Sequence, residues 1–209
     1  MTIYASNFPI LRPVPPKKPV PGWGAEHAEA AIAALQAALP DAVRETSKDW
    51  GQVLLVADRA RVHDALRFLR DDPACGFDML LDLTCIDYLN YPGELSGNAR
   101  YVEYPPHAER FAVSYVLRST THRSWLRVKA WLPESAPAVP SASDLWPAAN
   151  WAEREAAEMY GMVFQGHPDP RKLLLPQAYE GFPLRKDYPL RGRGERENFP
   201  RYVYEEDAE

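Results

Sequence analysis

Apolar positions recur at helical spacing in two early segments of the chain and predict two helices with a strand between them. In residues 25–39, Ile32 and Leu35 belong to an apolar series spaced by three and four residues, which is typical of a surface helix with one buried face. Residues 52–57 form a short run rich in valine and leucine, so we expect a strand there. Residues 59–71 return to the helical spacing before a proline ends the pattern.

The middle of the chain changes to patterns that predict strands. Residues 77–88 are mostly apolar and indicate a central strand. Residues 110–118 and 125–132 alternate between apolar and polar positions across a polar turn, which predicts an antiparallel hairpin. The order of these elements favours an α+β fold, a single domain with a mixed or antiparallel sheet and packed helices.

A third helix is expected over residues 144–160, because Asp144 is a favoured N-cap residue and Gly161 a natural terminator. Glu155 and Glu158 lie one turn apart on one face of this helix, with Arg154 beside them. The predicted packing face is a neighbouring stripe of small and apolar residues, namely Leu145, Ala149, Ala152, Ala156 and Met159.

Two carboxylates on one helix face are compatible with three kinds of site. They suit a paired acid/base site, half of a metal site of the E-x-x-H type, or a platform for ion pairs. No histidine stands at the spacing that the metal site needs. A solvated charged face is the commonest role of such a run, and the helix alone leaves these alternatives open.

The segment after the third helix reads as an extended tail. It carries G-H-P-D-P-R-K at 166–172, G-F-P-L-R-K at 181–186 and D-Y-P-L at 187–190, and each proline disfavours helix before it. Such a segment cannot bury its apolar side chains by itself, so we expect them to lie on another subunit. The residues concerned are Leu173, Leu174, Leu175, Phe182, Leu184 and Tyr188.

These patterns divide the chain into three parts. Residues 1–24 form a proline-rich arm with a polyproline II stretch, residues 25–165 an α+β core domain, and residues 166–209 an extended docking tail rich in proline and arginine. The arm lacks the apolar region of a signal peptide, and no run of 18 apolar residues occurs, so membrane contact is expected only through partners. A net charge of −5 argues against a nucleic-acid partner.

The remaining candidates for chemistry are sparse. Cys75 and Cys85 are too few for an iron–sulfur cluster or a structural zinc, so we interpret them as buried free thiols. Asp82 and Asp87, near the end of the strand at 77–88, suit turn capping better than catalysis. The scattered histidines His63, His107 and His122 are interpreted as surface residues. Glycine-rich phosphate loops and G-x-S-x-G elbows are absent from the sequence.

Several motifs together resemble one known family. E-R-E-A-A-E-M-Y-G at 153–161, followed by G-H-P-D-P-R-K and P-L-R-K-D-Y-P-L, is similar to the signature of the 30 kDa-type subunit, designated C, of the proton-pumping NADH:quinone oxidoreductase of respiratory complex I. The likeness begins at Phe77 with L-L-D-L-T-C-I-D-Y. Two departures are Phe182, where the family usually has histidine, and a long loop at 92–109.

The resemblance implies a non-catalytic subunit of the peripheral arm, and enzyme activity only as part of the complex. Electrons would pass from NADH to quinone, coupled to proton translocation, through FMN and iron–sulfur clusters in partner subunits, with no cofactor in this chain. The implied partners are the large quinone-site subunit and its cluster-bearing neighbour. The implied location is peripheral, on the cytoplasmic side of the inner or plasma membrane, or on the matrix side in an organelle.

The charged residues of the signature helix and tail are then expected at subunit interfaces, because carboxylates and guanidinium groups pair well across them. Two alternatives stay open: the equivalent subunit of a ferredoxin- or hydrogenase-linked relative, and a free-standing enzyme that uses Glu155, Glu158 and His167. No catalytic, cofactor-binding or metal residue is predicted. The expected interface residues are Glu153, Arg154, Glu155, Glu158, His167, Asp169, Arg171, Arg185, Lys186 and Asp187.

Overall fold

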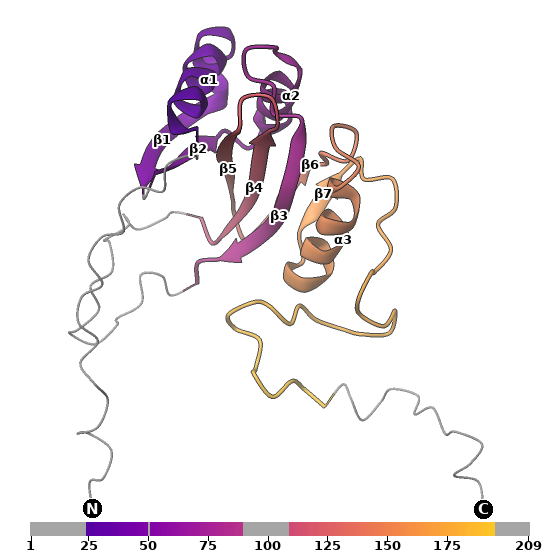
Figure 1. The fold of residues 1–209 in the computed structure, drawn as a ribbon. Helices are drawn as coiled ribbons and strands as arrows, with labels where there is room; N and C mark the ends of the chain where they lie inside the picture. Colours follow the sequence, from indigo (N-terminus) through magenta and orange to yellow (C-terminus); the bar gives the residue numbers. More distant parts are fainter. Residues whose placement is uncertain (1–23, 50, 90–108, 195–209) are drawn as a thin grey trace, which may run out of the picture.

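The fold is built on one five-stranded sheet with helices on one face and a smaller unit at one edge (Figure 1). The computed structural model describes residues 24–49, 51–89 and 109–194. Most of the predicted arm, the loop at 92–109, His107 and the end of the tail lie outside these residues. In spatial order the sheet contains β1 (Val43–Asp49), β2 (Gln52–Ala57), β5 (Ser124–Leu132), β4 (Phe111–Ser119) and β3 (Met79–Asp87).

The sheet is mixed, as the α+β prediction allows. Strands β4 and β5 form the predicted antiparallel hairpin, with Val113 opposite Ala130. Strand β2 runs parallel to β5, whereas β3 is antiparallel to β4. The strictly alternating hairpin strands turn one apolar face inward, and Phe111 and Tyr115 of that face are completely buried. The predicted fold class is therefore confirmed.

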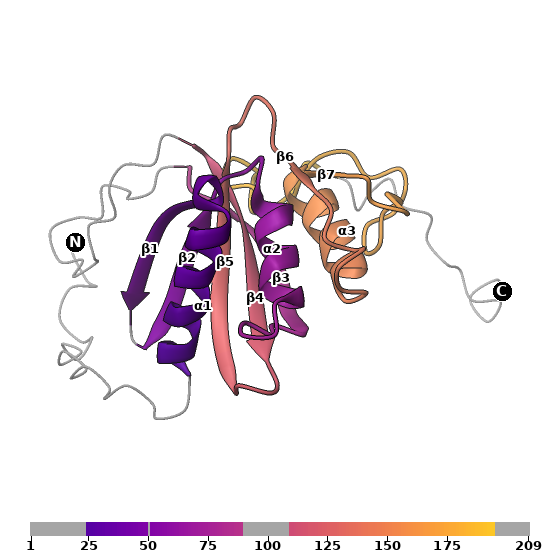
Figure 2. The same cartoon turned by 90° about the horizontal axis from the view of Figure 1, so that it is seen from above.

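Helices α1 (Ala25–Ala38) and α2 (Val62–Asp71) lie side by side on one face of the sheet, as Figure 2 shows. The predicted apolar series of α1 is buried, including Ile32 and Leu35. Helix α2 starts later than the expected residue 59, because Asp58 first forms a turn in which its carboxylate accepts the Ala60 N–H at 2.8 Å. The helices in the described ranges are too short or too polar to cross a membrane.

Four short elements were not predicted. The 3₁₀ turn η1 (Pro40–Ala42) leads into β1, an edge strand whose sequence V-R-E-T-S-K-D has no apolar alternation. Strand β6 (Ala138–Pro140) lies inside the expected linker and pairs in parallel with β7 (Val163–Gln165), which follows the third helix. These two strands and the third helix form the unit at the edge of the sheet, next to β3 (Figure 1).

The third helix, α3 (Ala149–Tyr160), corrects the prediction at its start and confirms it at its end. It has 12 residues and begins at Ala149, not at the predicted cap Asp144, whose carboxylate instead contacts His63 on α2 at 2.8 Å. Gly161 terminates the helix in the left-handed region, at φ 75°. A Cβ at this position would lie 2.5 Å from the Arg185 guanidinium, so glycine is also required for that close approach.

Both cysteines are buried free thiols, as predicted. Burial raises the pKa of Cys75 to about 11 and raises that of Cys85 even more. Neither thiol is therefore ionised near neutral pH, and both act as packing residues.

Candidate subunit interface at helix α3 and the tail

Helix α3 presents three different faces, and the charged residues of the signature are divided among them. The core face holds Ala149, Glu153 and Ala156, all buried. The predicted stripe is correct for Ala149 and Ala156, whereas Ala152 and Met159 are only half-buried. The prediction missed Glu153, although its spacing of four and three residues from the two alanines places it on their face.

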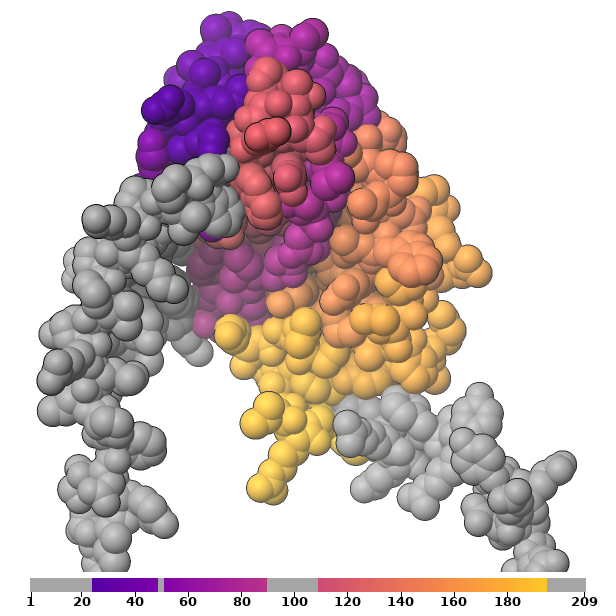
Figure 3. Space-filling model, in the orientation of Figure 1, coloured from indigo at the N-terminus to yellow at the C-terminus, as the bar shows by residue number. Residues whose placement is uncertain are grey.

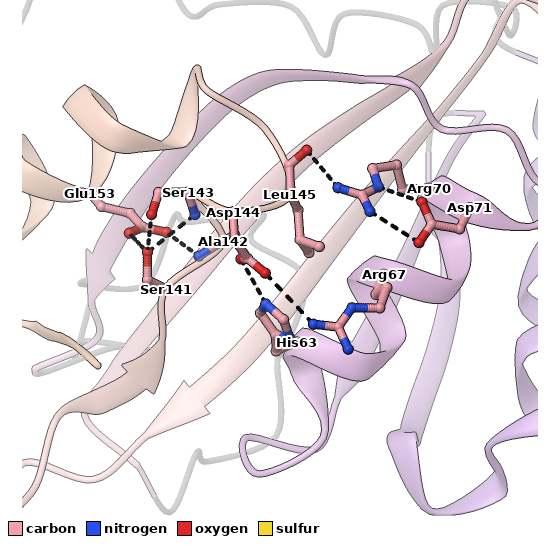
Figure 4. A network of polar contacts seen from close by, with 10 residues as sticks. All are labelled: His63, Arg67, Arg70, Asp71, Ser141, Ala142, Ser143, Asp144, Leu145 and Glu153. Atoms are coloured by element: carbon pink, nitrogen blue, oxygen red, sulfur yellow. Dashed lines mark hydrogen bonds and ion pairs between the residues drawn. The ribbon is translucent and has the colours of Figure 1, made fainter. Parts of the chain in front are cut away.

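Glu153 fastens the segment before the helix to the helix itself (Figure 4). Its carboxylate is inaccessible to solvent and accepts hydrogen bonds from Ser141 Oγ and from the Ala142 N–H, each at 2.6 Å. Burial raises the pKa of Glu153, although these two hydrogen bonds oppose the shift. Glu153 is an internal residue in this chain and does not face a partner.

The same segment is held from its other side by helix α2 (Figure 4). Asp144 contacts His63 at 2.8 Å and the Arg67 guanidinium at 3.6 Å. Arg70 Nη1 donates to the Leu145 carbonyl at 2.8 Å. Since α3 follows directly, these contacts fix the helix relative to the main sheet. His63 was interpreted only as a surface histidine, and no local spacing links it to Asp144.

Glu158 faces the tail and organises its first loop. Its carboxylate, nearly buried, accepts the consecutive backbone N–H groups of Leu173, Leu174 and Leu175 at 3.0, 2.8 and 3.1 Å. Consecutive N–H groups that converge on one carboxylate form an anion-binding nest. Glu155 is exposed, so the two glutamates do not form an acid/base pair.

Arg154 binds the same loop from the neighbouring turn of α3. Its Nε donates to the Arg171 carbonyl at 2.8 Å and its Nη2 to the Lys172 carbonyl at 3.1 Å. Asp169 lies 3.4 Å from Arg154 Nη1 and accepts two hydrogen bonds from the Arg171 guanidinium, which holds the pKa of Asp169 well below its usual range. Three predicted interface residues therefore meet in one cluster.

His167 is placed between the helix and the tail. Its Nε2 lies 3.0 Å from the Asn150 carbonyl and is therefore the protonated nitrogen, while its Nδ1 accepts the Asp169 N–H at 3.0 Å. Both ring nitrogens are thus engaged by the backbone, and the side chain is 5% exposed. This arrangement does not support the free-standing enzyme, which needs an accessible imidazole.

The second half of the tail is anchored at Arg110, which the sequence analysis did not select. The Arg110 guanidinium contacts Asp87 at 2.8 Å, Asp187 at 2.9 Å and Glu134 at 2.5 Å. Asp87 also accepts the Lys186 N–H at 2.9 Å. Burial raises the pKa of Asp87 and the hydrogen bonds from Arg110 lower it, with a net shift downward. The structural interpretation of Asp87 is therefore correct.

Arg185 completes the attachment at the end of α3. Its Nε donates to the Tyr160 carbonyl at 2.6 Å, and its guanidinium lies over the rings of Phe182 and Phe111, 4.4 and 5.1 Å from their centroids. Phe182, the departure from the family pattern, thus contributes an aromatic face for Arg185. The Leu184 N–H donates to the Met159 carbonyl at 3.2 Å.

Residues 166–194, which we call the tail platform, therefore lie against α3 and the ends of β3 and β4 (Figure 3). We expected their apolar side chains to need another subunit, but the chain's own helix supplies part of the surface. Leu173, Leu175 and Tyr188 are half-buried within the chain. Leu174 remains 61% exposed and Leu184 49% exposed, which leaves apolar surface on the platform.

A family model described as "Respiratory-chain NADH dehydrogenase, 30 Kd subunit" matches residues 55–194, which contain the main sheet, α3 and the tail platform. The chain belongs to this family. The resemblance seen in the sequence is thereby confirmed, and the chain is a subunit of the respiratory NADH dehydrogenase with a role in electron transport as part of that complex.

Individual relatives agree with this assignment. A protein of Hyphomonas neptunium, named as the NADH-quinone oxidoreductase subunit that is designated C, is 42% identical over 77% of this chain and 71% of its own length. The protein of the same name from Thiobacillus denitrificans is 41% identical over 80% of this chain and 79% of its own length.

Two solved structures share the fold of this 30 kDa-subunit family. A trypsin-resistant fragment of Nqo5 is 30% identical, with a TM-score of 0.53 over 68% of this chain and 98% of the fragment. A chain of a membrane-bound sulfane sulfur reductase, an archaeal respiratory membrane complex, has a TM-score of 0.60 over 86% of this chain and 96% of its own. At 18% identity the second likeness concerns the fold alone.

The described residues offer no candidate metal centre. They contain no group of three or more histidine, cysteine, aspartate or glutamate side chains placed to hold a metal ion. The carboxylates of α3 that suggested half of a metal site are hydrogen-bonded inside the chain, at Glu153 and Glu158, or exposed, at Glu155. The geometry of the site is that of a fastened scaffold.

Proposed function

We propose that this chain is a scaffold of the peripheral arm of the NADH:quinone oxidoreductase, and that its own residues transfer neither electrons nor protons. One observation carries the proposal: the charged residues of the signature hold the tail platform against α3 and the sheet. Glu158, Arg154 and Arg185 each bind backbone groups on the opposite side of this junction. A rigid platform of this kind suits the positioning of neighbouring subunits.

The partners proposed for this platform are the large quinone-site subunit and its cluster-bearing neighbour, with FMN and iron–sulfur clusters carried by partner subunits. The family description and the names of the relatives support assembly into a quinone-reducing complex. The proposed location is peripheral, on the cytoplasmic side of the inner or plasma membrane, or on the matrix side in an organelle, with membrane contact only through the complex.

The ten expected interface residues take two different roles in this proposal. Glu155 and the side chains of Arg171, Lys186 and Asp187 are exposed and available to a partner. The others act behind the surface and give the platform its shape. These supporting residues are Glu153, Arg154, Glu158, His167, Asp169 and Arg185.

The test is Glu158→Gln in the complete complex. An amide has a single acceptor oxygen and an NH₂ group that faces N–H donors, so the nest at 173–175 loses acceptors and the platform is less well held. We expect less assembled complex on native gels but normal quinone reduction for each assembled complex. Full assembly with electron transfer lost would show that Glu158 takes part in the chemistry. The exposed Glu155→Gln serves as the matched control and should leave both quantities unchanged.

A further inference from the structure

Helix α3 and the tail platform border a hollow of about 310 Å³. One wall is the face of α3 that carries Ala157 and Glu158, and the other consists of residues 170–172 and 179–182 of the tail. The contacts of Glu158 and Arg154 with the first loop hold these walls apart at a fixed separation. The hollow is therefore a built feature of the junction between helix and tail.

The charged groups that line the hollow are already paired. Glu158 accepts its three backbone N–H groups, Arg154 binds two carbonyls, and Lys172 Nζ lies 3.2 Å from the Gln177 carbonyl and also contacts that of Tyr179. A free anion or cation would have to displace these contacts. The rest of the lining includes the apolar side chains of Ala157, Pro170 and Phe182, so the hollow suits an apolar group.

The size and the rim of the hollow indicate a protein side chain as the occupant. Pockets for small ligands range from about 300 to 1,000 Å³, so this one is at the lower limit and fits one large side chain. Such pockets for single anchors are typical of interface hot spots. Leu174 and Leu184 stand exposed beside it, since their N–H groups bond to Glu158 and to the carbonyl of Met159. Apolar surface around a pocket marks a protein contact.

The charge of the platform indicates the character of that protein. Residues 166–194 contain six lysines and arginines and three acidic residues, a net charge of +3. The whole chain has a net charge of −5, so the remainder carries −8. A basic platform on an acidic chain favours an acidic partner surface, because complementary potentials steer and orient association.

We propose that the hollow is the socket for an apolar side chain carried by an acidic segment of a neighbouring subunit in the complex. The proposal rests on the proposed function, because it requires the chain to be assembled. It assigns the partner contact to the junction between α3 and the tail, and it gives Phe182 and Ala157 a direct role in docking. The paired charges of Arg154 and Glu158 keep the socket open for that contact.

The first experiment fills the socket. Ala157→Phe places a ring in the hollow, and Ala178→Phe adds the same ring at an exposed position of the tail that does not line it. Loss of one anchor at a hot spot corresponds to about a tenfold weaker association. We expect about tenfold less assembled complex for Ala157→Phe than for Ala178→Phe, with similar circular dichroism of the two isolated chains. Equal assembly of the two variants would contradict the socket.

The second experiment does not depend on a disruptive variant. A photoreactive benzoylphenylalanine replaces Phe182, and the purified complex is irradiated and analysed by mass spectrometry. The expected product joins position 182 to a neighbouring subunit, at an apolar residue flanked by aspartate or glutamate. A cross-link to a segment without acidic residues, one to this chain's own acidic residues 195–209, or none in assembled complex overturns the proposal. Failure of the wild-type chain to co-purify with the complex refutes the proposed function instead.

Discussion

Two buried carboxylates on one short helix act as fasteners, and they differ in how visible they are in the sequence. Glu153 shares its helical spacing with the buried Ala149 and Ala156, so a glutamate on an apolar stripe is a signal that could have been read. Glu158 has no such signal. Its partners are backbone N–H groups of a loop 15–17 residues further on, and no side-chain pattern reports them.

Glu153 leads to a prediction about stability and pH. Glu153→Ala leaves the Ser141 hydroxyl and the Ala142 N–H buried without their partner, at a cost of about 1–3 kcal/mol for each group. Glu153→Gln keeps an acceptor oxygen and removes the buried charge, so we expect a smaller loss. The free energy of unfolding at neutral pH, measured in urea, should therefore rank wild type, then Gln, then Ala.

The pH dependence follows from the raised pKa of Glu153. Because the folded state binds this proton more tightly than the unfolded state, the contribution of Glu153 to stability grows as pH falls through the folded pKa. It levels off below the unfolded pKa. The advantage of wild type over Glu153→Gln should thus increase between neutral and mildly acidic pH. A constant or shrinking difference would show that burial does not dominate at this carboxylate.

At the scale of elements, strong periodicity explains which predictions succeeded. Helix α1, strand β2 and the β4–β5 hairpin were predicted closely, because each has a clear apolar series over its whole length. Strand β1 was missed because it is a polar edge strand, and β6 and β7 because three-residue strands that pair across 25 residues have no local pattern. The start of α3 was misplaced because Asp144 is engaged by α2, a long-range contact.

The end of α3 allows a matched test of how the tail is held. Gly161→Ala introduces a side chain at φ 75°, with a Cβ 2.5 Å from Arg185 Nη2 and 2.7 Å from the Phe182 ring. Gly166→Ala has a similar φ of 79°, but nothing lies within 4 Å of its Cβ. Both substitutions carry the cost of a non-glycine residue in the left-handed region, about 1–2 kcal/mol. Only Gly161→Ala should also displace the Arg185 attachment.

The measurement is limited proteolysis of the two variants beside the wild type, with cleavage sites located by mass spectrometry. Gly161→Ala should be cleaved faster between residues 172 and 190, because the platform has lost a point of attachment. Gly166→Ala should show at most the modest increase caused by backbone strain. Identical cleavage of the two variants would mean that the contacts of Arg185 and Phe182 do not hold the tail.

At the scale of the whole molecule, the tail was predicted in character but not in position. Its prolines and unburied leucines correctly indicated an extended segment in need of a surface. The sequence did not show that α3 and the end of β3 supply much of that surface, because Arg110 reaches Asp87 and Asp187 across 23 and 77 residues. The boundary between core and tail at residue 165 stays a prediction.

The uneven charge of the chain gives the last prediction. Lys186 and Arg191 are exposed on the basic tail platform, and the attachment of Lys186 uses its backbone N–H, so its side chain can be changed without loss of that bond. Lys186→Glu combined with Arg191→Glu turns the platform from +3 to −1. We expect slower and weaker assembly onto an acidic partner, most visible at low ionic strength, because exposed charges are screened by salt.

The control carries the same change of charge on another surface. Lys48→Glu with Arg61→Glu alters the net charge of the chain equally, on β1 and next to α2, and each of these side chains is 44–47% exposed. If net charge alone governs assembly, the two double variants will behave alike. If the platform faces an acidic partner, only the tail variant will assemble poorly, and the deficit will narrow as salt is raised. Reconstitution of the complex with each purified chain over a range of salt concentrations separates these outcomes.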